Sequence, residues 1–196
     1  MWCEMLTGSP RIPSITREEE PLLPRRRRLS PRQRRVGTRR NARERVEPRP
    51  GTYALLLSST ANDEIQIGKR GKLRLRPGYY LYVGSALGPG GLRARLAHHL
   101  RPAERPHWHI DYLRAHTIPE QVWFSYHLRS REHAWARCIS AISSVSAPMA
   151  GFGSSDCRCE THLFFFRQRP RPADLHFRGL PGGAPTIGDV ARPTAD

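Results

Sequence analysis

The chain has few cysteines and no long apolar run. Its four cysteines are Cys3, Cys138, Cys157 and Cys159, and the last two are too close in sequence for an ordinary structural bridge, so a disulfide framework is excluded. No segment has the apolar stretch of about 7–15 residues of a secretory signal, or the ~18 apolar residues of a membrane span. We therefore expect a cytoplasmic protein with no membrane partner.

Both ends of the chain have little apolar sequence. Residues 1–48 are rich in arginine, and residues 170–196 are rich in proline, glycine and alanine. Neither segment has enough apolar surface to offset the conformational entropy that ordering would cost. We therefore expect a disordered Arg-rich leader at 1–48, a folded domain at 49–169 and a disordered tail at 170–196.

Lysine is scarce, since Lys69 and Lys72 are the only two, but arginine is abundant. Residues 1–50 contain 14 arginines and 6 acidic residues, which gives a net charge of +8, and residues 51–169 contain 16 basic and 8 acidic residues, again +8. Because the folded part is itself basic, the composition favours a polyanionic partner, nucleic acid in particular. An arginine-rich surface that only faces solvent is the alternative.

Hydrophobic periodicity predicts an α+β fold, with a small mixed β-sheet flanked by helices. Apolar or alternating runs predict strands at 52–58, 79–83, 120–128 and 162–166 and a hairpin around 68–71, and helices are expected at 91–100, 107–115 and 130–144. The glycine-rich stretch 84–91 lacks the Gly-Lys-Ser/Thr ending of a nucleotide-binding loop, so that type of site is excluded.

The predicted helix 91–100 places two cationic side chains beside its apolar face. Leu92, Leu96 and Leu100 recur every four residues and form one stripe. Arg95 and His99 are also four apart, and at 100° per residue they lie on the shoulder of that stripe, where the helix meets the rest of the domain. They are candidates for a site at this junction.

Two triplets precede that helix, GTY at 51–53 and YVG at 82–84, and a later helix opens with Glu132. This order of motifs resembles the GIY-YIG nuclease superfamily. The segments IGK at 67–69, GYY at 78–80, YVGSA at 82–86, HWHIDYL at 107–113 and GFGSSDC at 151–157 are similar to its Uri-type branch of small stand-alone proteins. The similarity covers the chain from about residue 51 to 166.

The resemblance implies a DNA endonuclease that uses one divalent ion, Mg²⁺ or Mn²⁺. By that resemblance Tyr53, Tyr82, Arg95 and His99 are catalytic, and Glu132 is both catalytic and the metal ligand. These residue types suit the reaction, because cleavage of a phosphodiester needs a group that takes a proton from water and cations that stabilise the developing charge.

Each of these residues also has a structural explanation. A tyrosine in a strand is common in a core, His99 near a helix end can interact with the helix dipole, and Glu132 suits the first turn of a helix. Among the acidic residues, Glu104, Asp111 and Glu120 compete with Glu132 as metal ligands.

Cys157, Cys159 and His162 raise the possibility of a zinc site, as do His107 and His109, because thiolate and imidazole are the usual ligands of zinc. The Cys-x-Cys spacing is not the common zinc-knuckle spacing, so we expect zinc less than Mg²⁺ or Mn²⁺. Besides the endonuclease, two further hypotheses remain open: a non-catalytic nucleic-acid binding module on a GIY-YIG scaffold, and a zinc-stabilised interaction protein.

Overall fold

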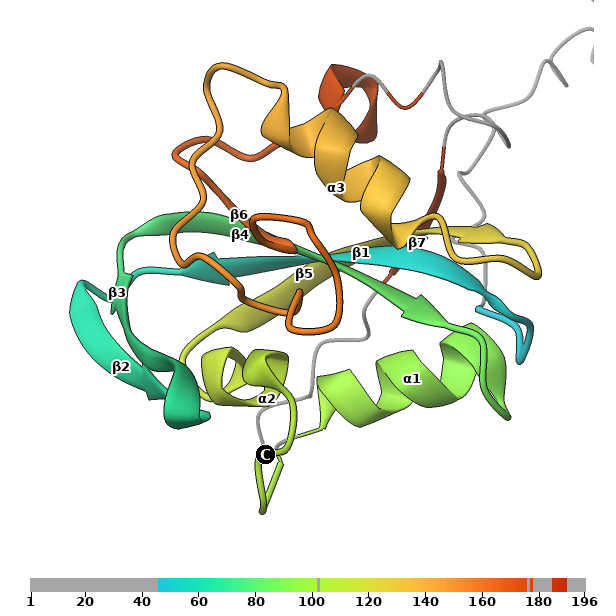
Figure 1. The fold of residues 1–196 in the computed structure, drawn as a ribbon, viewed down its shortest axis with the longest axis horizontal. Coiled ribbons are helices and arrows are strands. Elements are labelled where there is room, and N and C mark those ends of the chain that lie inside the picture. The colour runs from blue at the N-terminus through green and yellow to red at the C-terminus, as the bar shows by residue number, and fades with distance from the viewer. Residues whose placement is uncertain (1–45, 102, 176, 178–184, 190–196) are drawn as a thin grey trace, which may run out of the picture. The chain divides into compact units, whose positions relative to one another are not determined.

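The structure is a computed structural model that describes residues 46–101, 103–175, 177 and 185–189. Its centre is a five-stranded sheet with the order β6-β4-β1-β5-β7 (Figure 1). The strands are β1 (Gly51–Ser59), β4 (Gly78–Ala86), β5 (Ile118–Tyr126), β6 (Leu163–Phe166) and β7 (Thr186–Asp189). The predicted α+β class is confirmed, although these strands pair antiparallel throughout, where we expected a mixed sheet.

Helices cover both faces of the sheet (Figure 1). The helices α1 (Gly91–Leu100) and α2 (His109–Arg114) lie below the sheet in this view, and α3 (Glu132–Ser140) lies above it. A separate hairpin of β2 (Asp63–Ile67) and β3 (Gly71–Leu75), joined by a 3-10 turn at Gly68–Arg70, packs against α2. The helix predicted at 91–100 is confirmed, since α1 has these bounds.

The alternation of side chains along β1 explains why the domain has two cores. Tyr53, Leu55 and Leu57 point to the face that α1 and α2 cover, and Ala54 and Leu56 point to the face that α3 covers. All five are at most 1% exposed, which is typical of a central strand buried on both sides.

Part of the segment that we expected to be a disordered tail belongs to the domain. A 3-10 turn at Pro172–Leu175 places Leu175 in the α3-side core, and Phe177 packs there against Trp135, with ring centroids 4.8 Å apart. Farther along, β7 pairs with β5. The tail prediction was wrong here because composition averages over a segment and does not register two well-placed apolar side chains.

The leader expected at 1–48 lies outside the described residues up to position 45. Val46 already packs against the core, and the backbone N–H of Glu47 donates to the Tyr126 hydroxyl at 2.7 Å. The described domain therefore begins slightly before position 49. None of the helices in the described part of the chain is both long and apolar enough to span a membrane.

The strand β6 begins opposite Tyr82, which leaves room for a site beside the last residues of β4. This strand pairs with Tyr79–Tyr82 of β4, and just past it the backbone N–H of Val83 donates to the carbonyl of His162 at 2.9 Å. The last residues of β4 then continue toward α1 without β6 beside them. Side chains from both cores can meet at this edge.

Candidate active site

A cavity of about 390 Å³ brings together all five predicted site residues. Tyr53 comes from β1, Tyr82 from β4, Arg95 and His99 from α1, and Glu132 from the first turn of α3. The cavity is also lined by residues of β4, of the start of α2 with the segment before it, and of the loop before β6: Gly84, Ser85, His107, Trp108, His109, Gly153, Ser155 and Asp156. The five predicted residues, of which Tyr53 and Glu132 are 79 positions apart, thus face the same cavity.

Tyr53 and His99 form a buried pair. The Tyr53 hydroxyl lies 2.8 Å from Nε2 of His99, and the two residues are 1% and 2% exposed. Gly84 pairs with Tyr53 across the two strands, and a Cβ at position 84 would lie 2.5 Å from the tyrosine hydroxyl. The glycine of the YVG triplet therefore makes room for the Tyr53 ring.

Asp111, from α2, lies behind His99. Its Oδ1 is 3.7 Å from Nδ1 of His99, an electrostatic contact, and its Oδ2 accepts hydrogen bonds from the backbone N–H groups of His107 and Trp108, each at 3.0 Å. Burial opposes ionisation of this carboxyl group, but His99 and the two N–H groups outweigh burial and hold the pKa of Asp111 well below its usual range. A carboxylate thus faces Nδ1 and favours a proton there, which leaves Nε2 to accept from Tyr53.

Burial shifts the pKa values of Tyr53, Tyr82 and His99 in the direction that keeps each side chain neutral. It raises the pKa of Tyr53 and of Tyr82 well above that of an ordinary phenol, with Glu132 adding to the effect. It lowers the pKa of His99 below its ordinary value, although Asp111 acts in the opposite direction. Near neutral pH the site therefore contains two neutral phenols and a neutral imidazole.

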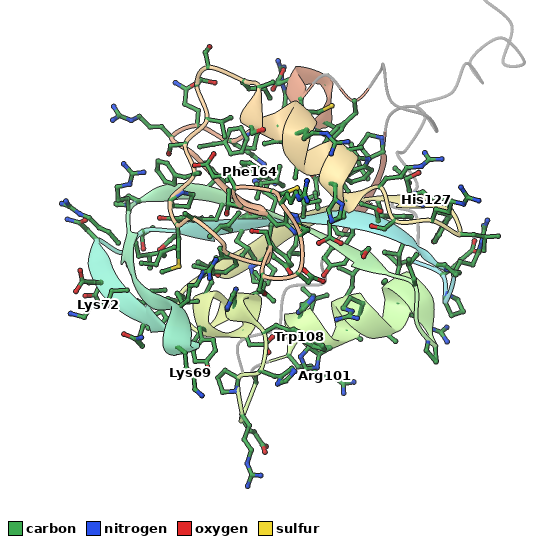
Figure 2. The ribbon with its side chains drawn as sticks, viewed as in Figure 1. Lys69, Lys72, Arg101, Trp108, His127 and Phe164 are labelled. Atoms are coloured by element: carbon green, nitrogen blue, oxygen red, sulfur yellow. The ribbon has the colours of Figure 1, made fainter. Side chains whose placement is uncertain are left out.

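Arg95 is held over the face of Trp108, with its guanidinium carbon 4.5 Å from the ring centroid. Figure 2 shows Trp108 in the segment that joins α1 to α2, beside the end of α1. The indole is 37% exposed, so it forms part of the rim of the cavity. This stacking orients a permanent positive charge next to the cavity and leaves the guanidinium donors available.

Glu132 has a protein partner at each carboxylate oxygen. The Ser85 hydroxyl donates to Oε2 at 2.7 Å, and Nδ1 of His162 lies 2.7 Å from Oε1. Burial alone would raise the pKa of this carboxyl group, but His162 and Ser85 hold the pKa of Glu132 below its usual range. Each carboxylate oxygen has two lone pairs and uses one of them in these contacts, so the second lone pair of each oxygen can still face the cavity.

The three competing acids have other places. Asp111 lies beside His99, as described above. Glu120 accepts from Ser58 at 2.7 Å and from Arg169 at 3.0 Å, and Glu104 lines a separate hollow near the end of α1. Among the four candidates, only Glu132 lines the cavity.

Two groups of described residues have ligand atoms within 4.8 Å of one another, close enough to hold a metal ion. One consists of His98, His99 and Asp111, and the other of His133, Cys157 and His162. The second contains two of the residues that suggested zinc, with His133 in place of Cys159, which packs against the α3-side core. His107 and His109 instead line the cavity, where the Gly153 N–H donates to Nδ1 of His109 at 3.0 Å.

Sequence reasoning did not predict several contacts that complete the site. Ser85 and His162 as partners of Glu132, Trp108 under Arg95 and Asp111 behind His99 all depend on contacts between distant elements. Each had a sequence signal, since Ser85 and Trp108 lie in the segments YVGSA and HWHIDYL, Asp111 was a competing acid and His162 a possible zinc ligand, but no signal indicated these contacts.

Comparison with known proteins gave one match. The sequence profile of a family described as "Domain of unknown function DUF123" matches residues 52–179. The matched range extends beyond β6 and includes Leu175 and Phe177, in agreement with their place in the core. Searches of curated proteins and of solved structures each gave no match.

Proposed function

Since the chain belongs to the DUF123 family, whose description assigns no activity, its function must be inferred from the site, and we propose that it is a metal-dependent endonuclease that hydrolyses phosphodiester bonds of DNA. The observation that carries this proposal is the single cavity lined by Tyr53, Tyr82, Arg95, His99 and Glu132. The motifs that carry these residues resemble those of GIY-YIG nucleases, and the net charge of +8 over residues 51–169 suits a polyanionic substrate.

Tyr53 and His99 form a path for the proton of the attacking water. The Tyr53 hydroxyl takes that proton while it passes its own to Nε2 of His99, 2.8 Å away. A free tyrosinate is not needed, which is important because burial raises the pKa of Tyr53. Asp111 then stabilises the imidazolium that forms, through the contact at Nδ1.

Arg95 and Tyr82 act on the charge and on the water. The guanidinium of Arg95 supplies donors to the phosphate oxygens, whose negative charge grows as the water attacks. Tyr82 has a neutral hydroxyl that positions the water by a hydrogen bond, and its ring lies 6.3 Å from that of Tyr53, centroid to centroid.

The residues at the cavity fit a hard divalent cation such as Mg²⁺ or Mn²⁺. Glu132 is ionised and lines the cavity, and the carboxylate of Asp156 lines it too. Such an ion usually keeps several waters and binds one or two carboxylates together with substrate phosphate. When bound at Glu132, it supplies Lewis-acid stabilisation of the phosphate charge.

The test is cleavage of labelled duplex, single-stranded, flap and branched DNA, and of RNA, by the full-length protein with Mg²⁺ or Mn²⁺. Tyr53→Phe removes a hydroxyl and Glu132→Gln removes a negative charge, each with little change in shape, and we expect cleavage to fall about 100-fold or more in both. Glu104→Gln, an exposed acid outside the cavity, is the matched control and should cut normally. Equal cleavage by Glu132→Gln and the wild type would refute the assigned site.

A second candidate is a nucleic-acid binding module that does not cut. It is favoured by the contacts of Glu132, since Ser85 and His162 already give both carboxylate oxygens a structural role. Salt-sensitive binding to DNA with no cleavage of any substrate, under either metal, would select this function over the endonuclease.

A further inference from the structure

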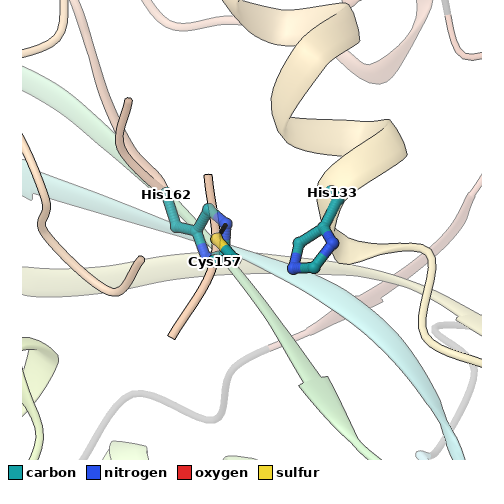
Figure 3. A group of neighbouring side chains, drawn as sticks. All are labelled: His133, Cys157 and His162. Carbon is teal, nitrogen blue, oxygen red and sulfur yellow. Dashed lines mark hydrogen bonds between the residues drawn. The ribbon is translucent and has the colours of Figure 1, made fainter. Parts of the chain in front are cut away.

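A second cluster of metal-ligating side chains lies next to the cavity, around His162. His133 reaches from the first turn of α3 toward Cys157 and His162, which come from the loop before β6 (Figure 3). One ligand atom from each of the three lies within 4.8 Å of the other two. The nuclease mechanism above uses neither His133 nor Cys157.

The distance between two of these atoms suits a tetrahedral ion. Sγ of Cys157 lies 3.5 Å from Nε2 of His162. In a zinc site, with Zn–S about 2.3 Å and Zn–N about 2.0–2.1 Å, tetrahedral angles place a sulfur and a nitrogen ligand about 3.5 Å apart. His133 is exposed, so its side chain can adjust toward the other two.

The other nitrogen of His162 has the partner that a metal-bound histidine usually has. Its Nδ1 lies 2.7 Å from Oε1 of Glu132, a close electrostatic contact, and Ser85 holds the second oxygen of that carboxylate. Histidines that bind metal through one ring nitrogen commonly direct the other N–H at a carboxylate, which fixes the ring and its tautomer. The buried ring of His162, 1% exposed, thus presents Nε2 toward Cys157.

Two of the three side chains of the cluster face open space. His133 and Cys157 both line a cavity of about 620 Å³ on the α3 side of the domain. Asp156 lines this cavity and the active-site cavity, so the two are neighbours. Three protein ligands beside such a space leave a fourth position for water or another exchangeable ligand.

The geometry points to a zinc site formed by Nε2 of His162, Sγ of Cys157 and a ring nitrogen of His133, with a fourth position open to this cavity. Two imidazoles and a thiolate favour Zn²⁺ over Mg²⁺ or Mn²⁺, which prefer oxygen ligands. The inference does not depend on the nuclease proposal. The two sites share Glu132, which orients His162 on one side and lines the active-site cavity on the other.

The test loads the full-length protein with Zn²⁺, removes excess ion on a desalting column and measures the metal by mass spectrometry. We expect one zinc per chain, and Co²⁺ in its place should give a thiolate-to-cobalt charge-transfer band in the near ultraviolet. Cys157→Ala should lose the zinc and the band. Cys138→Ala is the matched control, because Cys138 lies on α3 outside both the cluster and its cavity, and it should keep both. Cys159→Ala removes a thiol that lines the same cavity and contacts that of Cys157, and because Cys159 is not one of the three ligands, this variant should keep both as well.

Two further variants separate ligation from folding. His133→Ala changes an exposed side chain, so it should fold normally and lose zinc. Glu132→Gln leaves the three ligands in place, and zinc affinity should fall about 10- to 100-fold, the effect of removing an outer partner of a ligand. Circular dichroism checks the fold of each variant, and azide should shift the visible bands of the cobalt protein if the fourth position is open.

Three results would overturn the proposal. The first is wild-type protein that retains no zinc, which would mean that Cys157 and His162 share only a thiol hydrogen bond. The second is loss of the cobalt band in Cys159→Ala with the band kept in Cys157→Ala. The third is full zinc retention by a folded His133→Ala.

Discussion

At the residue scale, the site depends on side chains that fit against one another with little free space. The Tyr53 ring lies over Gly84, its hydroxyl reaches His99, and Asp111 lies behind the imidazole. Each contact constrains the next, since a shift of the tyrosine ring changes the distance to Nε2. Substitutions that change the size or shape of these side chains only slightly should therefore affect both stability and activity.

Gly84→Ala should disrupt the pair of Tyr53 and His99. The new Cβ would lie 2.5 Å from the tyrosine hydroxyl, so the ring has to move, and overpacking of this kind costs about 1–3 kcal/mol of the free energy of unfolding. Urea unfolding measures the loss. Gly88→Ala is the control, because nothing lies within 4 Å of its Cβ position and its φ is not positive. Equal stability of the two variants would contradict the crowding at Gly84.

Asp111→Asn should make His99 harder to protonate. The charge of Asp111 raises the pKa of His99 against the effect of burial, so its removal moves that pKa still lower. Neutral His99 accepts the proton in the proposed mechanism, and activity is then lost as pH falls through its pKa. The acid limb of the pH–rate profile should therefore shift to lower pH in Asp111→Asn.

An NMR titration of the His99 ring follows the same pKa without an activity measurement, so it tests the contact even if the protein does not cut. Glu104→Gln serves as the control for both experiments, since Glu104 lies outside the active-site cavity. A rise in the pKa of His99 in Asp111→Asn would show that Asp111 does not stabilise the imidazolium.

At the scale of elements, each helix contributes a different part of the site. The helix α1 presents Arg95 near its middle and His99 in its last turn, α2 carries Asp111, and α3 begins with Glu132. The N-terminus of α3 is tied to the sheet, since the backbone N–H of Arg131 donates to Oγ1 of Thr52 on β1 at 2.9 Å. The position of Glu132 thus depends on how firmly α3 packs on the sheet.

The segment after β6 strengthens that packing, and Phe177→Ala tests its contribution. Phe177 is 1% exposed and lies against Trp135 of α3, so truncation to alanine should lower the free energy of unfolding by about 3–5 kcal/mol. Ile187→Ala is the matched control on β7, where the side chain is 45% exposed, and should cost much less. Denaturant unfolding measures both, and a small effect at Phe177 would show that this segment is not part of the core.

At the scale of the whole molecule, the distribution of charge is the main feature. The net charge is +16, and the first 45 residues contain 13 arginines and 5 acidic residues. The folded part keeps a positive balance of its own. Nucleic-acid binding should therefore have two components, one from the domain and one from the leader.

Removal of residues 1–45 should reduce the salt dependence of DNA binding and leave the cleavage chemistry unchanged. Each phosphate contact that is lost lowers the slope of log K against log salt by about 0.9 for duplex DNA. Residues from Val46 onward stay, because Val46 and Glu47 contact the domain. Fluorescence anisotropy over a salt series measures the slope, and loss of cleavage at low salt would show that the leader takes part in the reaction.

The sequence alone was enough to predict the elements with strong local patterns. The leucines of α1 at every fourth position predicted its bounds, and the same spacing predicted that Arg95 and His99 lie beside the apolar face. Alternating residues predicted the hairpin of β2 and β3. These predictions were possible because the period of side-chain directions is a property of each element by itself.

Only the tertiary structure decided which residues meet. The pairing of Tyr53 with Gly84, the contact of Asp111 with His99 and the place of Phe177 against Trp135 join segments between 12 and 42 positions apart. The group of His133, Cys157 and His162 likewise depends on α3 and the loop before β6 meeting over the sheet. Strand register and helix docking are set by the packing of whole faces, and no local pattern contains that information.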